Sequence, residues 1–192
     1  MSDHYDFVVV GAGPAGSAAA LEAARLGYGR ILLIDKAPLG RTKPCGGGIS
    51  PRARKVLKRM GLWEAVHREA YPIKGLRLVS PGGKEIVLAG SHAASVLNRS
   101  RFDTILTEAA IREGVVLKPE TRVHGIIEEG GRIVGIRSDA GEIRARWTLV
   151  ANGATSRLVP DPRSVACCTP AWPGSTGSLS PRTSLRWSTT RA

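Results

Sequence analysis

Residues 6–36 restrict the fold more than any other stretch of the chain, because they contain a complete dinucleotide-binding unit. The apolar run 7–10 is typical of a strand that is buried on both faces of a parallel sheet. It leads into the sequence GAGPAG. There Gly11 permits a sharp turn, Gly13 lets a pyrophosphate approach the backbone, and Gly16 lets the next helix pack closely on the sheet. We therefore expect a cofactor that contains a pyrophosphate.

The helix and strand that follow complete this predicted site. The helix extends from about Pro14 to Leu26. Its unpaired N–H groups and the positive end of its dipole suit a phosphate. A second strand, 31–34, ends at Asp35, whose carboxylate is placed to accept hydrogen bonds from both hydroxyls of an adenosine ribose. The predicted cofactor-binding residues at this end are Gly11, Gly13, Pro14, Ala15, Gly16, Asp35 and Lys36.

A basic, glycine-rich loop runs from the second strand to a second helix. The loop contains KPCGGG, residues 43–48. Ser50 is predicted to cap the helix and Pro51 to be its first residue. Apolar positions that share one face of this helix are Ala53, Val56, Leu57 and Met60. The loop is thereby expected to be anchored at both ends.

The middle of the chain is predicted to combine a hairpin, a helix and a meander. Two strands, 75–79 and 84–89, flank a Pro-Gly-Gly turn in an inserted segment at about 71–97. Ser100 and Asp103 resemble a capping box. The helix after them has an apolar stripe made of Phe102, Ile105, Leu106, Ala109 and Ala110.

Further strands are predicted at 115–117, 123–127, 133–138 and 142–147, separated by glycine turns. This series of strands is expected to form an antiparallel meander. An apolar strand, 148–151, is then expected to re-enter the nucleotide-binding sheet.

The motifs together resemble the FAD-dependent geranylgeranyl reductase family, which belongs to the larger group of flavoproteins similar to p-hydroxybenzoate hydroxylase. The resemblance rests on GAGPAG, on the acid that ends the second strand, and on KPCGGG before a helix. It also rests on NRSRFDTIL at 98–106 and TLVANGATS at 148–156, and it covers about residues 5–157. Asn152 stands where the larger group usually has aspartate. The implied fold is α/β, a Rossmann-like FAD-binding fold with inserted antiparallel strands.

The resemblance implies a reductase that saturates carbon-carbon double bonds of isoprenoid chains, with a hydride from reduced FAD. Cys45, Gly46 and Gly47 then lie in the loop beside the isoalloxazine ring and are the catalytic candidates. Arg101 corresponds to the flavin segment and Gly153 to the later glycine segment. The electron donor is NAD(P)H or ferredoxin. The implied partner is an isoprenoid or other lipid substrate.

Alternatives remain open at this point. Cys45 is also explained by packing of a small apolar residue, and Arg101 by a solvated position in the first turn of a helix. An FAD-dependent aromatic monooxygenase shares GAGPAG and the later arginine. A noncatalytic nucleotide-binding fragment is the third function considered.

The charge of the chain favours a lipid surface over nucleic acid. The 192 residues carry a net charge of +12, with a pI near 10.5. The basic residues form no continuous helical stripe, and no zinc-ligand spacing occurs, so neither nucleic acid nor a metal is expected. Attraction to anionic lipid suggests peripheral association with the membrane. The sequence shows no signal peptide, so a cytoplasmic protein is expected.

The composition changes at about residue 158. Residues 158–192 are rich in Pro, Ser, Thr and Arg and lack helical or strand periodicity. We consider a flexible basic tail, a linker to a partner, and a frameshifted reading frame, of which the last is favoured because the resemblance stops just before. The predicted organisation is an incomplete FAD-binding domain at 1–157 and an irregular tail at 158–192. On this basis the chain is expected to be truncated and inactive or poorly folded.

Overall fold

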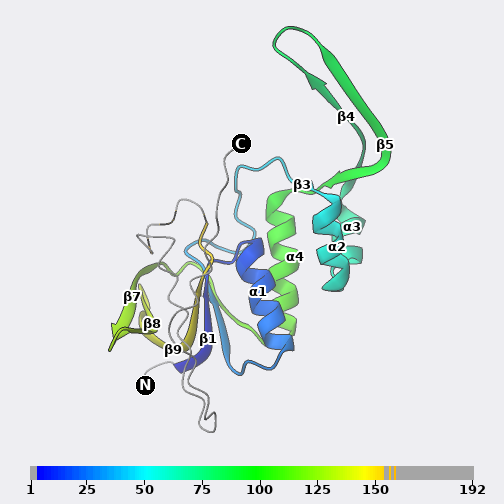
Figure 1. The fold of residues 1–192 in the computed structure, drawn as a ribbon. Helices are drawn as coiled ribbons and strands as arrows, with labels where there is room; N and C mark the ends of the chain where they lie inside the picture. Colours follow the sequence, from blue (N-terminus) through cyan, green and yellow to red (C-terminus); the bar gives the residue numbers. More distant parts are fainter. Residues whose placement is uncertain (1–3, 154–155, 157, 159–192) are drawn as a thin grey trace, which may run out of the picture.

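A computed structural model describes residues 4–153, 156 and 158. Its centre is a six-stranded mixed sheet with the strand order β6-β2-β1-β9-β8-β7 (Figure 1). A separate three-stranded sheet, β3-β5-β4, extends away from this body. The predicted α/β class with a parallel sheet and added antiparallel strands is therefore confirmed.

The parallel half of the large sheet is formed by four strands. β1 (His4–Val10) lies between β2 (Ile31–Ile34) and β9 (Gly141–Val150), and β6 (Val116–Lys118) pairs with β2. All three pairings are parallel. Every residue of β2 is buried, as its apolar sequence predicts for a strand covered on both faces.

Two helices cover one face of this sheet. α1 (Pro14–Arg25) packs beside α4 (Arg99–Arg112), as Figure 1 shows. The predicted apolar stripe of α4 belongs to the hydrophobic core on this side, which also contains Leu21 and Leu33. A second core on the opposite face joins β1 and β2 to Ile136 and Ile143.

The antiparallel half is continuous with the parallel half. β7 (Val123–Glu129) pairs with β8 (Arg132–Ser138), and β8 pairs with the first residues of β9. We predicted separate strands at 142–147 and 148–151. They are one strand, because no turn residue lies between Trp147 and Thr148 and the strand changes partner from β8 to β1 near Arg144.

α2 (Pro51–Arg59) and α3 (Trp63–Glu69) lead into the hairpin. The predicted cap of α2 is confirmed, since the Ser50 hydroxyl accepts a hydrogen bond from the Ala53 N–H. Leu57 and Met60 are buried as predicted. Val56, which we placed on the buried face, is 43% exposed, so the buried face of α2 is narrower than predicted and contains Leu57 and Met60.

The hairpin consists of β4 (Tyr71–Val79) and β5 (Glu85–Val96), and β5 also pairs with the short β3 (Gly48–Ile49). The strands are longer than the predicted 75–79 and 84–89, because pairing continues past a register shift between Ile73 and Gly75. The turn between them lies where Pro81, Gly82 and Gly83 predicted it.

The start of α4 differs from the expected capping box. Asn98, not Ser100, is the N-cap, and its side chain accepts a hydrogen bond from the Ser100 N–H. Asp103 is turned inward and is only 2% exposed, because two arginines provide partners for its carboxylate. Of the predicted tail, only Leu158 lies among the described residues, and it packs against the second core.

Candidate functional site

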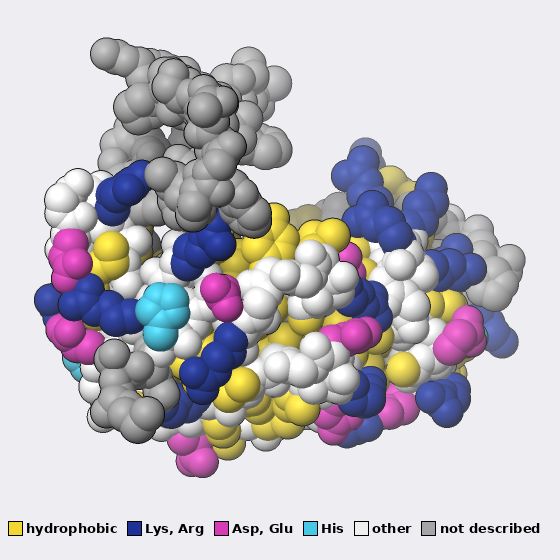
Figure 2. Space-filling view, turned by 90° about the horizontal axis from the view of Figure 1, so that it is seen from below, with side chains coloured by type: hydrophobic (Ala, Val, Ile, Leu, Met, Phe, Trp, Pro, Cys, Tyr) yellow, Lys and Arg dark blue, Asp and Glu magenta, His cyan; other side chains and the backbone are white. Residues whose placement is uncertain are grey.

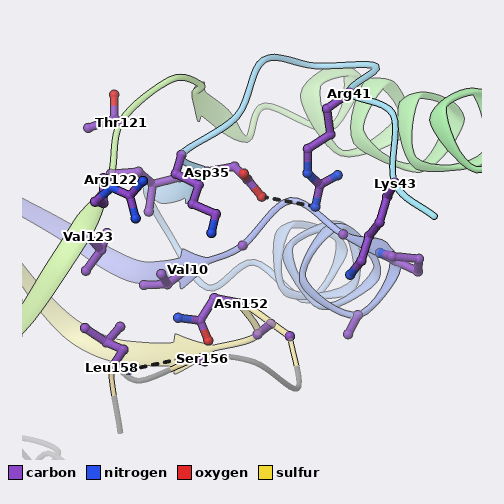
Figure 3. Close-up of a pocket in the computed structure, with 18 of the residues that line it drawn as sticks. Val10, Asp35, Arg41, Lys43, Thr121, Arg122, Val123, Asn152, Ser156 and Leu158 are labelled. Carbon is purple, nitrogen blue, oxygen red and sulfur yellow. Dashed lines mark hydrogen bonds and ion pairs between the residues drawn. The ribbon is translucent and has the colours of Figure 1, made fainter.

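A cavity of about 470 Å³ opens at the carboxyl ends of β1, β2 and β9. This is the edge at which parallel α/β sheets bind ligands, and the volume is within the usual range for small-molecule sites. Figure 3 shows Asp35 and Arg41 on one side of it and Asn152, Ser156 and Leu158 on the other. Of the predicted cofactor-binding residues, the cavity lining contains Gly11, Gly13, Pro14, Ala15, Asp35, Lys36 and Gly153.

The three glycines of GAGPAG meet different surroundings. Gly11 has a φ of +109°, and a Cβ there would lie 2.6 Å from the Ala151 carbonyl oxygen. A Cβ on Gly16 would lie 1.8 Å from the Gly11 carbonyl oxygen, so this glycine allows α1 to pack on the turn. Gly13 has a negative φ of −81°. A Cβ there would meet only two side-chain atoms, Nη2 of Arg99 at 3.8 Å and Nη2 of Arg41 at 4.0 Å, both at ordinary van der Waals distance, so the position opens toward two guanidinium groups.

This open space is suited to a phosphate group. Gly13 is the N-cap of α1 and offers no side-chain cap to the helix. The first N–H groups of α1 and the positive end of its dipole therefore point toward the same place as two guanidinium groups. A phosphate would receive donors from both sides.

Asp35 lies at the end of β2 as predicted, but its carboxylate already has backbone partners. Oδ2 accepts a hydrogen bond from the Ala12 N–H at 2.7 Å, and Oδ1 accepts one from the Ala37 N–H at 2.9 Å. Arg41 Nη2 lies 3.7 Å from Oδ2. A carboxylate has about four acceptor positions, so these bonds leave capacity for a ribose hydroxyl. The side chain also fixes the glycine-rich turn to the strand beside it.

Arg99, at the first position of α4, lines the cavity. Its Nε donates to Oδ1 of Asp103 at 2.7 Å, and Nη1 of Arg41 donates to Oδ2 of the same carboxylate at 3.2 Å. The Arg99 side chain is 19% exposed. Two cations at the cavity are thus held by one buried anion.

Arg101 lies elsewhere. It is not in the cavity lining, and it forms a two-bond ion pair with Glu69 of α3, at 2.7 and 2.8 Å. This pair is solvent-exposed, and its hydrogen bonds lower the pKa of Glu69 and raise the pKa of Arg101. Arg99, two residues earlier, lines the cavity.

The KPCGGG loop passes beside the cavity. Lys43 lines it, whereas Cys45, Gly46 and Gly47 do not. The Cys45 thiol is exposed and accepts a hydrogen bond from the Gly47 N–H at 3.4 Å. This bond, followed by a hydrogen bond from the Arg99 guanidinium, holds the pKa of Cys45 below its ordinary value. Cys45 thus lies close to the cavity through its contact with Arg99.

The cavity lining also contains residues that the sequence did not single out. Most are basic or lie after β6 and β9: Arg41, Lys43, Arg99, Thr121, Arg122, His124 and Ser156. The spacing of Arg99 and Asp103, four residues apart on a helix, was the available signal for their ion pair. The positions of residues 121–124 depend on the pairing of β6 with β2 and carry no local signal.

The lining charge is strongly positive. Lys36, Arg41, Lys43, Arg99 and Arg122 surround one carboxylate, Asp35. Outside the cavity, Figure 2 shows Lys and Arg side chains in several places on one face, interspersed with Asp and Glu. An anionic ligand is therefore the chemical class that the cavity favours.

The described residues include no group of three or more His, Cys, Asp and Glu side chains that could hold a metal ion. None of the helices in the same part of the chain combines the length and apolar character needed to cross a bilayer.

Comparisons with known proteins agree with this geometry. Residues 4–162 match the family model described as FAD binding domain. The digeranylgeranylglycerophospholipid reductase of Picrophilus torridus is 33% identical over 168 residues, which cover 82% of this chain and 41% of that protein. The menaquinone reductase of Mycobacterium tuberculosis is 38% identical over 166 residues, 82% of this chain and 40% of that protein.

A solved structure also matches most of this chain and less than half of its own length. The geranylgeranyl bacteriochlorophyll reductase-like protein of Thermoplasma acidophilum superposes with a TM-score of 0.69 and 30% identity, over 80% of this chain and 40% of that one. The chain therefore spans about two fifths of the length of the relatives that it matches. The resemblance that the motifs indicated is confirmed over this part.

Proposed function

This chain belongs to the FAD binding domain family, and on that premise we propose that it holds the ADP half of FAD in the cavity at the ends of β1, β2 and β9. The protein that contains this domain would then be an FAD-dependent oxidoreductase. Its relatives are named as reductases, one of them for a digeranylgeranyl lipid. We extend the proposal to the reduction of carbon-carbon double bonds in isoprenoid chains.

The observation that carries the proposal is the open space at Gly13. A Cβ at this position would project toward Arg99 and Arg41 without touching the backbone. A glycine that no packing contact requires, at a helix N-terminus and opposite two guanidinium groups, is suited to the pyrophosphate of FAD. The residues present therefore fit the group that the family implies.

The adenosine would lie on the Asp35 side of the cavity. Asp35 has acceptor capacity left for a ribose hydroxyl, and Lys36, Thr121 and Arg122 line the same region. A 2′-phosphate on this ribose would place its negative charge against the carboxylate of Asp35. We therefore propose FAD rather than a cofactor with a 2′-phosphate at this site.

Bound FAD, once reduced, would supply the hydride for the double bond. Within this chain, Arg99 and Lys43 would orient the pyrophosphate, and the loop 43–48 would continue toward the flavin ring. Cys45, Gly46 and Gly47 stay predicted neighbours of the ring, with Cys45 packing against it and a direct chemical role as the second possibility. The predicted flavin contact of Arg101 stays a prediction. Arg99 lines the cavity and is better placed to contact the cofactor.

The remaining partners follow from the proposed class. NAD(P)H or ferredoxin would reduce the flavin, and an isoprenoid lipid would be the substrate. The basic surface would support peripheral attachment to an anionic membrane. Because the chain spans about two fifths of its relatives, we expect these 192 residues to bind FAD without sustaining turnover. An aromatic monooxygenase would differ by consuming oxygen together with hydroxylation.

The experiment is a binding titration of the purified chain with FAD, followed by flavin absorbance between about 300 and 550 nm and by fluorescence. We expect one FAD per chain, displaced by ADP but not by riboflavin, because in this proposal the cavity holds the ADP half of the cofactor. Riboflavin competition without ADP competition would contradict the proposal, as would the absence of FAD binding. Reduction of a geranylgeranyl lipid with dithionite-reduced FAD then tests turnover, and robust product formation would refute the expected inactivity.

A further inference from the structure

Two arginines at the proposed pyrophosphate position share one buried acid. Arg41 comes from the loop after β2, and Arg99 comes from the first turn of α4. Each donates to a different oxygen of the Asp103 carboxylate, at 3.2 and 2.7 Å. The Asp103 side chain is only 3% exposed, whereas the two arginines are 24% and 19% exposed. The acid is therefore inside the protein, and the cations extend from it to the cavity.

Hydrogen bonds one turn further along α4 also fix the position of Asp103. Its backbone carbonyl accepts a hydrogen bond from the Thr107 hydroxyl at 2.9 Å. The Thr107 hydroxyl lies 2.8 Å from that of Ser17 on α1, and both residues are fully buried. This chain of bonds joins α4 to the helix whose N-terminus faces the cavity. The carboxylate thus has a defined place relative to Gly13.

A buried carboxylate of this kind restricts its partners strongly. An arginine has several rotatable bonds, and an exposed one samples many orientations. Charge-assisted bonds to a buried acid select one orientation, because leaving the acid unpaired in the interior is costly. Both Nη2 atoms then lie within 4.0 Å of the Cβ position of Gly13. Without Asp103, Arg99 would lose the carboxylate that holds its guanidinium, and Arg41 would keep only its longer approach to Asp35.

We propose that Asp103 is a positioning residue for FAD binding: it orients Arg41 and Arg99 toward the pyrophosphate and joins the loop 38–47 to α4. This role rests on the proposed function. Asp103 does not line the large cavity and would not touch the cofactor there. Its effect on binding would pass through the two arginines.

The test is a double-mutant cycle on the full chain, with FAD affinity as the readout. We expect Asp103→Asn to weaken FAD binding about tenfold in the wild-type background. In an Arg41→Gln, Arg99→Gln background the same change should alter affinity less than about twofold, because the groups through which it acts are gone. A purely structural role would give equal losses in both backgrounds and would refute the proposal. Glu69→Gln is the matched control, because it breaks the exposed ion pair between α3 and Arg101, which lies on α4 like Asp103.

A second measurement needs no variant and no FAD. In the wild-type chain, NMR hydrogen exchange of the Arg99 Nε–H should be at least about tenfold slower than that of the Arg101 Nε–H, because only the first donates to a buried acid. Equal rates would refute the proposal even if Asp103→Asn fails to fold. Absence of FAD binding by the wild-type chain refutes the proposed function and this role together. Normal binding by both wild type and Asp103→Asn refutes only the role of Asp103.

Discussion

Alanine at Gly13 and alanine at Gly16 should have opposite consequences, although the two glycines lie three residues apart in one motif. A Cβ on Gly13 meets nothing closer than 3.8 Å, and the backbone there has a negative φ that alanine adopts readily. Replacing an N-cap glycine by alanine costs about 0.5 kcal/mol. The folded state of Gly13→Ala should therefore be nearly as stable as the wild type.

The effect of Gly13→Ala should appear in binding. Its methyl group would occupy the space between the helix N-terminus and the two guanidinium groups, where the pyrophosphate is proposed to lie. We expect FAD affinity to fall at least about 100-fold, or about 2.7 kcal/mol. Gly16→Ala is the contrasting variant. Its Cβ would lie 1.8 Å from a backbone oxygen, and the overpacking should cost about 3 kcal/mol, reduced by about 1 kcal/mol of helix propensity.

Urea denaturation followed by circular dichroism would measure stability, and flavin fluorescence would measure affinity. The expected pattern is a stable Gly13→Ala that binds FAD poorly and a Gly16→Ala that is at least about 2 kcal/mol less stable than the wild type. Gly27→Ala serves as a control outside the site: no atom lies within 4 Å of its Cβ, and only its φ of +73° is unfavourable. A Gly13→Ala protein that binds FAD within about threefold of the wild type would refute the placement of the pyrophosphate.

Other consequences concern the arginines, the thiol and the buried hydroxyls. Arg99→Gln should weaken FAD binding about tenfold and Arg101→Gln less than about twofold, measured by the same titration. The reverse order would support the predicted cofactor contact of Arg101 instead. Because its pKa is lowered, Cys45 should react with iodoacetamide at lower pH than an ordinary thiol, in a chain whose two other cysteines are replaced by serine. The thiolate forms as pH rises through the pKa, so Arg99→Gln should move the midpoint of this profile upward, and an unchanged midpoint would contradict the contact. Thr107→Val should destabilise the chain by about 1–3 kcal/mol in urea, because it leaves the Ser17 hydroxyl without its partner, and adding Ser17→Ala should recover part of that loss.

The sequence predicted most of the local structure in the first half of the chain, because the determinants there are short in range. The strand, glycine turn, helix and second strand of residues 6–36 each have a local reason for their residue types. The N-cap at Ser50 is likewise a local hydrogen bond. These elements were found close to the predicted positions.

Long-range pairing explains the features that were missed. Asp103 was assigned to a capping box because its sequence neighbours fit one, whereas its partners come from a loop about 60 residues earlier and from Arg99. Residues 121–124 line the cavity only because β6 joins the sheet beside β2. That Arg99 lines the cavity and Arg101 does not follows from which side of α4 faces the cavity, and the sequence motif does not contain that information.

The dual pairing of β9 has a consequence for synthesis. The first strand of the chain obtains its second neighbour only from the last described strand, with Val8 beside Thr148. A growing chain on the ribosome can build the first helix and β2 early, but the edge of β1 stays open until about residue 150 has emerged. Such an edge is a template for pairing with other chains. The chain is therefore most exposed to such pairing during the interval between synthesis of β1 and synthesis of β9. Codon changes that shorten this interval should raise the soluble yield.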